Sequence, residues 1–174
     1  MSVDFFWRRV ASGLLDDLSP KELGALVPHW FDAEFRPLRE AGMVMGVERN
    51  GCLMHFVLTS SGAASDGAAE LPVLGGEQRV EGEEDPDCGW VGTELWVLRP
   101  DGVREASAFL SHVVVDDLVT RLDAALAREV VSLGFSWPWS SLRAEELTAD
   151  LRELRSFFAS AAAAGDAMVK FESA

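Results

Sequence analysis

The last third of the sequence predicts a long amphipathic helix, from Ser141 to about Ala164. Its apolar residues recur in alternating steps of four and three and therefore share one face of a helix: Leu147, Leu151, Leu154, Phe158 and Ala161. At about 1.5 Å per residue, such a helix spans roughly 35 Å, which is close to the width of a small domain. Because one whole face is apolar, other elements must pack along it, and this requirement constrains the rest of the chain.

The residues after this helix predict its end and a final strand. Gly165 precedes Asp166, and glycine readily takes the left-handed conformation found at helix C-termini. The apolar run from Ala167 to Phe171 then predicts a short strand that returns along the fold.

The composition is that of a globular chain with one core. The chain has 174 residues, of which 48% are hydrophobic, and this predicts a single domain spanning residues 1–174. No apolar run reaches the length of about 18 residues that a membrane helix needs, and the N-terminus lacks the pattern of a signal peptide. We therefore expect a soluble, cytoplasmic protein without a membrane partner. Two cysteines, Cys52 and Cys88, fit a reducing compartment.

The charge balance restricts the class of partner. Acidic residues outnumber basic ones by 29 to 15, which gives a formal net charge of −14. A protein that binds nucleic acid must neutralise phosphates, so we expect no direct nucleic-acid binding. A basic protein partner is compatible with this charge, although net charge also serves solubility alone. The acidic run from Glu81 to Asp87, which contains Pro86, predicts a solvated loop, and its candidate partner-facing residues are Glu81, Glu83, Glu84, Asp85 and Asp87.

Several shorter elements carry boundary signals. The run from Ser19 to Glu22 has a capping serine, a proline at the first helical position and a glutamate three residues after the cap, which predicts a helix. Residues 90–98 predict a buried strand, and Pro100 with Asp101 predicts the start of a helix directly after it. A further helix is expected from Asp116 to about residue 128. Aromatic residues between 30 and 38 recur at helical spacing, with Pro37 indicating a kink or a break.

The stretch from Met43 to Thr59 fits two structures. Asn50-Gly51 between apolar runs is typical of a hairpin turn, which would make the flanking residues antiparallel strands. Leu53, Phe56 and Val57 also fit one face of a helix, and a run this short does not distinguish the two. The next residues, Ser60 to Glu70, are rich in Ser, Gly, Ala and Asp and predict a mobile surface loop.

The order of several motifs resembles that of the YfbM-like family of bacterial proteins of unknown function. The resemblance covers most of the chain from about Glu48 onward, and the residues that carry it are Met54 to Thr59, Val73 to Glu77, Leu98 to Glu105, Trp137-Pro138, and Phe157-Phe158 with Ala161 to Asp166. It implies an α+β fold, which we expect to be one compact domain whose small mixed sheet carries several helices. It also implies a helix around His55 and a strand from Val3 to Val10. The family supplies no activity that can be transferred to this chain.

The chain departs from that family pattern at three points. Gly51 lies near the position where the family has a tryptophan, and the region around Trp30 is additional sequence. The chain contains no tyrosine, so Phe157 and Phe158 replace ring hydroxyls that could otherwise transfer protons.

Candidate metal and cofactor sites are few. Cys52 and His55 would share a helix face, and Cys88 or His112 could complete a zinc site with them. No second closely spaced ligand pair exists, so we expect no metal site. The turn from Leu74 to Glu77 lacks the lysine and the serine or threonine of a phosphate-binding loop, which favours a simple tight turn and predicts no cofactor.

Two functional hypotheses follow from these patterns. The first is a non-catalytic module that binds, and in that way neutralises, a basic protein partner through the acidic run. The second is a small-molecule binding protein or an enzyme with an aromatic-lined pocket, for which the candidate residues are His55, Glu77, Trp90, Trp137 and Trp139. Tryptophans in a chain of this size also commonly complete the core.

Overall fold

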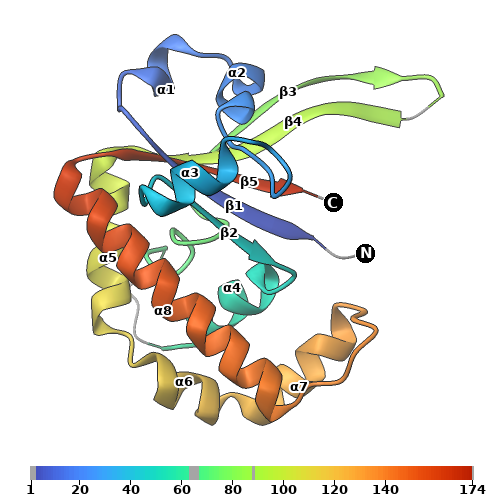
Figure 1. Ribbon diagram of the computed structural model, residues 1–174. Coiled ribbons are helices and arrows are strands. Elements are labelled where there is room, and N and C mark those ends of the chain that lie inside the picture. Colours follow the sequence, from blue (N-terminus) through green and yellow to red (C-terminus); the bar gives the residue numbers. More distant parts are fainter. Residues whose placement is uncertain (1–2, 63–66, 88, 174) are drawn as a thin grey trace.

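The computed structural model describes residues 3–62, 67–87 and 89–173, with the side chains of residues 89 and 90 left undescribed. Within these residues, strands form one sheet in the order β2-β1-β5-β4-β3, and every pairing is antiparallel (Figure 1). The strands are β1 (Asp4–Val10), β2 (Val44–Glu48), β3 (Glu77–Asp85), β4 (Gly89–Leu98) and β5 (Ala167–Ser173).

The α+β class and the strand after the long helix are confirmed, but the prediction of a mixed sheet is wrong. The direction of a strand depends on the end of the sheet at which its connection re-enters, and the residues of the strand do not encode that. The resemblance-based expectation of a strand near the N-terminus is confirmed by β1.

Helices cover both faces of the sheet. The three short helices α1 (Leu14–Asp17), α2 (Pro20–Ala25) and α3 (Phe35–Glu40) pack on one face, where Phe6 and Val169 are buried. The opposite face buries Trp7 and Met168. It is covered by α4 (Gly51–Thr59), α5 (Pro100–His112), α6 (Val115–Arg121), α7 (Asp123–Ser132) and α8 (Ser141–Ala164) (Figure 1). In this described part of the chain, no helix combines the length and the apolarity needed to cross a membrane.

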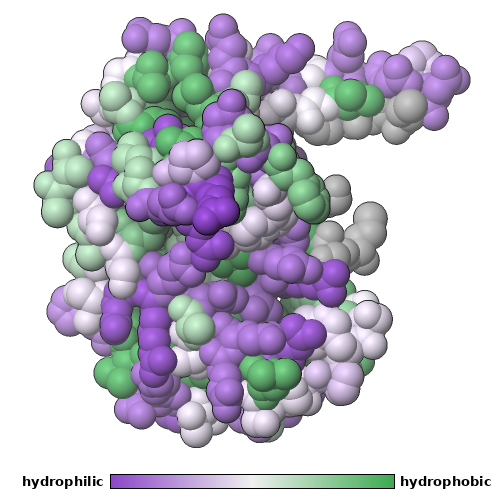
Figure 2. Space-filling view, in the orientation of Figure 1, coloured by the Kyte–Doolittle hydropathy of each residue, from purple (hydrophilic) through white to green (hydrophobic). Residues whose placement is uncertain are grey.

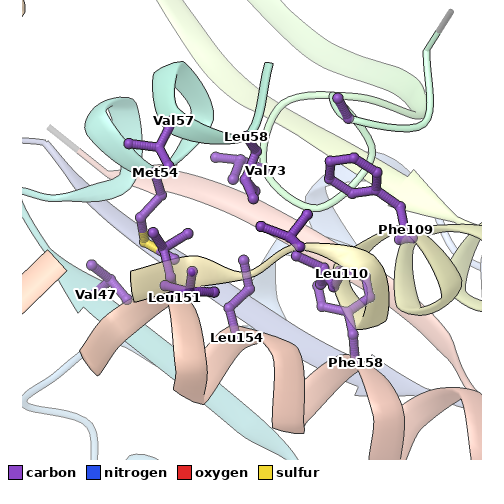
Figure 3. Packing of buried hydrophobic residues seen from close by; sticks show 14 of the residues in the cluster. Val47, Met54, Val57, Leu58, Val73, Phe109, Leu110, Leu151, Leu154 and Phe158 are labelled. Atoms are coloured by element: carbon purple, nitrogen blue, oxygen red, sulfur yellow. The ribbon is translucent and has the colours of Figure 1, made fainter. Parts of the chain in front are cut away.

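The predicted long helix is α8, and its apolar face forms a large part of the larger core. The Ser140 side chain accepts a hydrogen bond from the Arg143 amide at its start, and Gly165 ends it in the left-handed conformation, with φ of 73°. Figure 3 shows Leu151, Leu154 and Phe158 of α8 directed toward residues of α4 and α5. Burial of each such side chain contributes roughly 1.5–3 kcal/mol, so this face is a major source of stability.

The conflict between hairpin and helix is resolved in favour of the helix. β2 ends at Glu48, and α4 begins at Gly51 after only two connecting residues. Gly51 lies against the ring of Phe5, where a Cβ atom would come within 2.0 Å of the ring carbon Cδ2. The close packing of this glycine, rather than a hairpin turn, accounts for Gly51 in the Asn50-Gly51 pair.

The other boundary predictions are partly corrected. The capping box at Ser19 is confirmed, and the helix predicted at Pro100 is α5. The helix expected from Asp116 is divided at Leu122 into α6 and α7. Each of the two helices buries apolar residues of its own. The aromatic spacing before Pro37 does not extend the helix, since α3 begins only at Phe35.

The predicted surface loop at Ser60 to Glu70 is only partly exposed. Ala68 and Ala69 are buried as part of the larger core. Small apolar residues fit there, where the chain turns back toward the sheet. Residues 63–66 lie outside the described part of the chain.

Candidate functional site

A hairpin formed by β3 and β4 extends beyond the rest of the sheet. β4 pairs with β5 only through Leu95–Leu98, whereas its pairing with β3 continues to Gly89. Residues 80–94 therefore project from the body, and we call this segment the acidic arm (Figure 1). β3 is the last strand of the sheet, so its outer edge is unpaired among the described residues.

The acidic arm corrects the prediction of a solvated loop at Glu81 to Asp87. The residues are solvated, but those up to Asp85 belong to β3. A strand that is exposed on both faces needs no alternation of apolar residues, so its sequence resembles a loop. A turn signal was nevertheless present, because Asp85-Pro86-Asp87 is typical of a turn, and the Asp87 amide donates to Asp85 Oδ1 at 2.9 Å.

The predicted buried strand at residues 90–98 is buried only at its second half. Leu95, Val97 and Leu98 are in the core, whereas Val91 is 53% exposed. Trp90 lies in β4 opposite Glu84, which places this candidate residue in the arm, and its side chain is outside the described structure.

The charge of the arm is entirely negative. It contains no basic residue and six carboxylates: Glu81, Glu83, Glu84, Asp85, Asp87 and Glu94. The register puts Glu81 and Glu83 on one face together with Thr93 and Val91. Figure 2 shows the arm standing clear of the body, with a mostly hydrophilic surface and a smaller hydrophobic part.

A groove of about 520 Å³ lies between the base of the arm and α2. Its lining includes Lys21, Glu83, Val91 and the facing pair Gly82 and Gly92. The Lys21 amide donates to Glu81 Oε2 at 3.0 Å, which joins the arm to the first turn of α2. On the face that carries Glu81 and Glu83, Val91 offers an apolar surface beside the Glu83 carboxylate, and Lys21 is the one cation in the lining. This combination suits a lysine or arginine, whose stem is apolar and whose head is charged.

The remaining candidate residues do not form one pocket. Glu77 pairs with Arg79 at 2.9 Å at the base of β3. Trp137 packs on Phe135 with ring centroids 4.5 Å apart, and Trp139 Nε1 donates to Asp123 at 2.8 Å. The connection between α7 and α8 lies at the far end of the helical layer from the base of β3 (Figure 1).

His55 lies on α4 and is partly buried. Burial lowers the pKa of its imidazole, the charge of Glu70 raises it and that of Lys170 lowers it. Its Nδ1 atom is buried and makes no hydrogen bond with the described residues. The helix expected around His55 is confirmed, and the charged groups that act on its ring are Glu70 and Lys170.

The zinc hypothesis finds no support in residues 3–62, 67–87 and 89–173, where no three His, Cys, Asp or Glu side chains are grouped to hold a metal ion. Burial raises the pKa of the Cys52 thiol, and the charges of Glu172 and Glu129 raise it further. A raised pKa opposes the thiolate form that metals bind. Cys88 lies outside the described residues. His112 Nδ1 lies 2.7 Å from the carbonyl of Ala108, near the C-terminus of α5.

The sequence analysis missed a buried lysine at the centre of the sheet. Lys170 is 2% exposed, and its Nζ donates to the carbonyl oxygens of Leu71, at 2.5 Å, and Gly75. Trp7 faces Lys170 across the β1–β5 pair and donates to the carbonyl of Pro72 at 2.7 Å. These donors hold the turn at residues 71–76 on the sheet, and burial lowers the pKa of Lys170 to about 7.

The predicted tight turn at Leu74 to Glu77 is consistent with this arrangement. Gly76 has φ of 108°, and the Gly75 amide donates to the carbonyl of Glu70 at 2.7 Å. A single lysine in an apolar strand is the sequence signal for this clamp, because a lysine between buried residues needs acceptors for its protons.

A family model described as a domain of unknown function (DUF1877) matches residues 47–171. The chain belongs to this family. The solved structure of YfbM from Escherichia coli, a protein of unknown function, matches with a TM-score of 0.60 and 13% identity, covering 98% of this chain and 99% of that one. The similarity shows a shared fold, and it confirms the resemblance to YfbM-like proteins. No curated protein matches the chain.

Proposed function

We propose that this protein is a non-catalytic interaction module that binds a basic segment of a protein partner on the acidic arm. The observation that carries the proposal is a projecting hairpin with six carboxylates, no basic residue and an unpaired edge strand. Binding there would cover the basic surface of the partner, as expected for a protein that neutralises a toxin or a nucleic-acid-binding protein.

Charge selects among possible occupants of the arm. A second copy of this chain would bring like charges together across the paired edges, and like charges directly opposite each other in a sheet are destabilising. Nucleic acid is excluded on the same ground, because phosphates need cations. A peptide segment with lysine or arginine at alternate positions can pair with the main chain at the edge of β3, and its cations can pair with the carboxylates of the arm.

The mode of binding follows from the geometry. A strand of the partner adds to the outer edge of β3 through main-chain hydrogen bonds, and one of its basic side chains enters the groove beside Glu83 and Val91. Exposed ion pairs contribute only about 0.2–1 kcal/mol each. Several together give an interaction that salt weakens strongly.

The experiment is a pull-down with the tagged protein from native lysate at low and at moderate salt, followed by mass spectrometry and reconstitution with the purified partner. Three baits are compared: the wild type, Glu83→Lys with Glu84→Lys, and a control with Glu105→Lys and Glu145→Lys. The control changes the net charge equally at exposed helix positions.

The proposal predicts that the wild type and the control retain one near-stoichiometric basic partner, and that the arm variant loses it. A partner that binds all three baits equally contradicts the arm as the binding site. Recovery of no basic partner at low salt contradicts the function.

The alternative of an aromatic-lined pocket has weaker support. Trp137 and Trp139 lie together on the connection between α7 and α8, whereas Glu77 pairs with Arg79 at the base of β3. These contacts give no support to a single pocket.

A further inference from the structure

A polar pocket of about 470 Å³ lies at the β2 edge of the sheet, between α3, the β2–α4 connection and α8. Three arginines from these three segments line it, Arg39, Arg49 and Arg143, together with four carboxylates: Glu48, Glu146, Asp150 and Glu153. We call it the arginine pocket. It shares no lining residue with the groove of the acidic arm.

The backbone presents Arg49 to this pocket at a conformational cost. Arg49 has φ of 67°, the one left-handed residue other than glycine in the described chain. Glycine would take this conformation freely, so an arginine here indicates that its side chain is used. The guanidinium remains 44% exposed, and its Nε lies 3.1 Å from Glu48 Oε1.

The carboxylate of Asp150 lines the pocket and forms no salt bridge within the described residues. Asn50 is 5% exposed and donates from Nδ2 to Asp150 Oδ2 at 2.7 Å. Burial raises the pKa of Asp150, and the charges of Glu153 and Glu146 raise it further, against the Asn50 hydrogen bond and Arg39. An ammonium group placed beside Asp150 would relieve this repulsion.

Arg39 and Arg143 form partly exposed ion pairs, and Arg143 also lies over the ring of Trp137, 4.4 Å from its centroid. Arg39 pairs with Glu153 at 3.1 Å and Arg143 with Glu146 at 2.7 Å, and all four side chains are between 32% and 45% exposed. Exposed pairs of this kind are weak. A carboxylate from a ligand can replace a glutamate by accepting two parallel hydrogen bonds from one guanidinium.

We propose that the arginine pocket binds a small zwitterion of the α-amino-acid class, with its ammonium group on Asp150 and its carboxylate on Arg39 and Arg49. The pocket volume fits a ligand of this size. Trp30 also lines the pocket, and it offers an apolar surface to the side chain of the ligand. The site is independent of the acidic arm.

The test is a thermal-shift screen of the purified protein with each proteinogenic L-amino acid at millimolar concentration, followed by calorimetric titration of each amino acid that stabilises it. Each of these is compared with its des-amino acid and its carboxamide. We expect removal of either charged group to weaken binding by about ten- to a hundredfold, since a hydrogen bond to a charged group contributes about 1.5–3 kcal/mol.

Two variants test the assigned contacts. Asp150→Asn keeps an oxygen that can accept the Asn50 hydrogen bond while removing the charge that holds the ammonium. Arg49→Gly removes a guanidinium at a position where glycine suits the backbone, so folding is retained. Both are expected to weaken binding at least about tenfold, whereas Glu105→Gln on the exposed face of α5 and the arm variant Glu83→Lys with Glu84→Lys leave it unchanged.

Three results overturn the proposal. The first is that no amino acid binds at millimolar concentration. The second is that des-amino acids bind as tightly as the amino acids, which would make the site a simple anion site. The third is that Asp150→Asn and Arg49→Gly both bind like the wild type, which would place the ligand elsewhere.

Discussion

The acidic arm and the centre of the sheet treat charge in opposite ways. The arm holds six carboxylates, five of them on exposed residues, whereas the sheet buries one lysine against two carbonyl oxygens. Water screens the charges of the arm, so they cost little and remain available to a partner. The buried ammonium has lost its hydration, so its energy depends on the two acceptors and on its proton. The buried charge thus serves the architecture of the sheet, and the exposed charges are the ones that the proposed function assigns to recognition.

Removing the buried lysine should have the largest effect on stability. Lys170→Ala deletes a stem that fills the core and leaves the carbonyls of Leu71 and Gly75 without their donor. We expect a loss of about 3–5 kcal/mol, from the cavity and the unsatisfied acceptors together. Urea unfolding followed by circular dichroism measures it. A loss below about 1 kcal/mol, the typical effect of a point mutation, would mean that the turn at residues 71–76 does not depend on this clamp.

The next effect is a dependence of stability on pH. Lys170 has a pKa of about 7 in the folded protein and 10.5 as its ordinary value. Between these values the unfolded chain holds a proton that the folded protein lacks, so stability rises as pH increases through this range and is lowest below pH 7. One pKa unit corresponds to about 1.4 kcal/mol, so the gain between about pH 7 and pH 9.5 is on the order of 3 kcal/mol.

The control for this pH dependence is Lys170→Met, which keeps the apolar stem and removes the titrating group. Unfolding free energies of the two proteins, measured across the same pH series, should differ in slope. Equal slopes would assign the dependence to other groups.

A smaller effect is expected where the arm meets the body. Ser19→Ala removes the cap of α2. The first turn of this helix is joined to the arm, because the Lys21 amide donates a hydrogen bond to the Glu81 carboxylate. The expected loss is about 1 kcal/mol, with increased amide exchange at Lys21. Ser12→Ala, at a residue before α1, serves as the matched control. Unchanged exchange at Lys21 would show that the cap does not support the arm.

The smallest effect is expected in the arm itself. Glu83→Lys with Glu84→Lys should change stability by less than about 0.5 kcal/mol, because exposed substitutions away from special features are nearly neutral. Thermal unfolding measures it beside the Glu105→Lys and Glu145→Lys control. A loss above 1 kcal/mol, well outside the range typical of exposed sites, would show that these carboxylates stabilise the fold and would weaken the contrast between the two regions.

The fold was predictable where the sequence pattern and the local structure agree. The helix α8 follows from the spacing of Leu147 to Ala161 together with Gly165, and α2 follows from the box at Ser19. Both signals are local, since they depend on residues within a few turns of one another.

The candidate sites were less predictable, because they depend on contacts between distant residues. Lys170 meets the carbonyl of Leu71 across 99 residues, and Asn50 meets Asp150 across 100. Asn50 was recognised as part of a hairpin signal, whereas its role is to hold a carboxylate of another helix. The acidic run was proposed as a partner surface because of its charge, and that remains a proposal. Charge density reports solvation and not backbone conformation, so its strand was missed.

The position of β5 in the sheet has a consequence for folding. β5 lies between β1 and β4, so it alone connects the β2-β1 pair to the β4-β3 hairpin. The hairpin is a local structure that can form early, but β1 is joined to β5 and the residue before it by contacts such as Arg9 with Asp166, which are 157 residues apart. Contacts of such long range slow folding. The complete sheet therefore forms only after β5 has paired with both β1 and β4. Substitutions in β5 should change the rate of folding more than those in the arm.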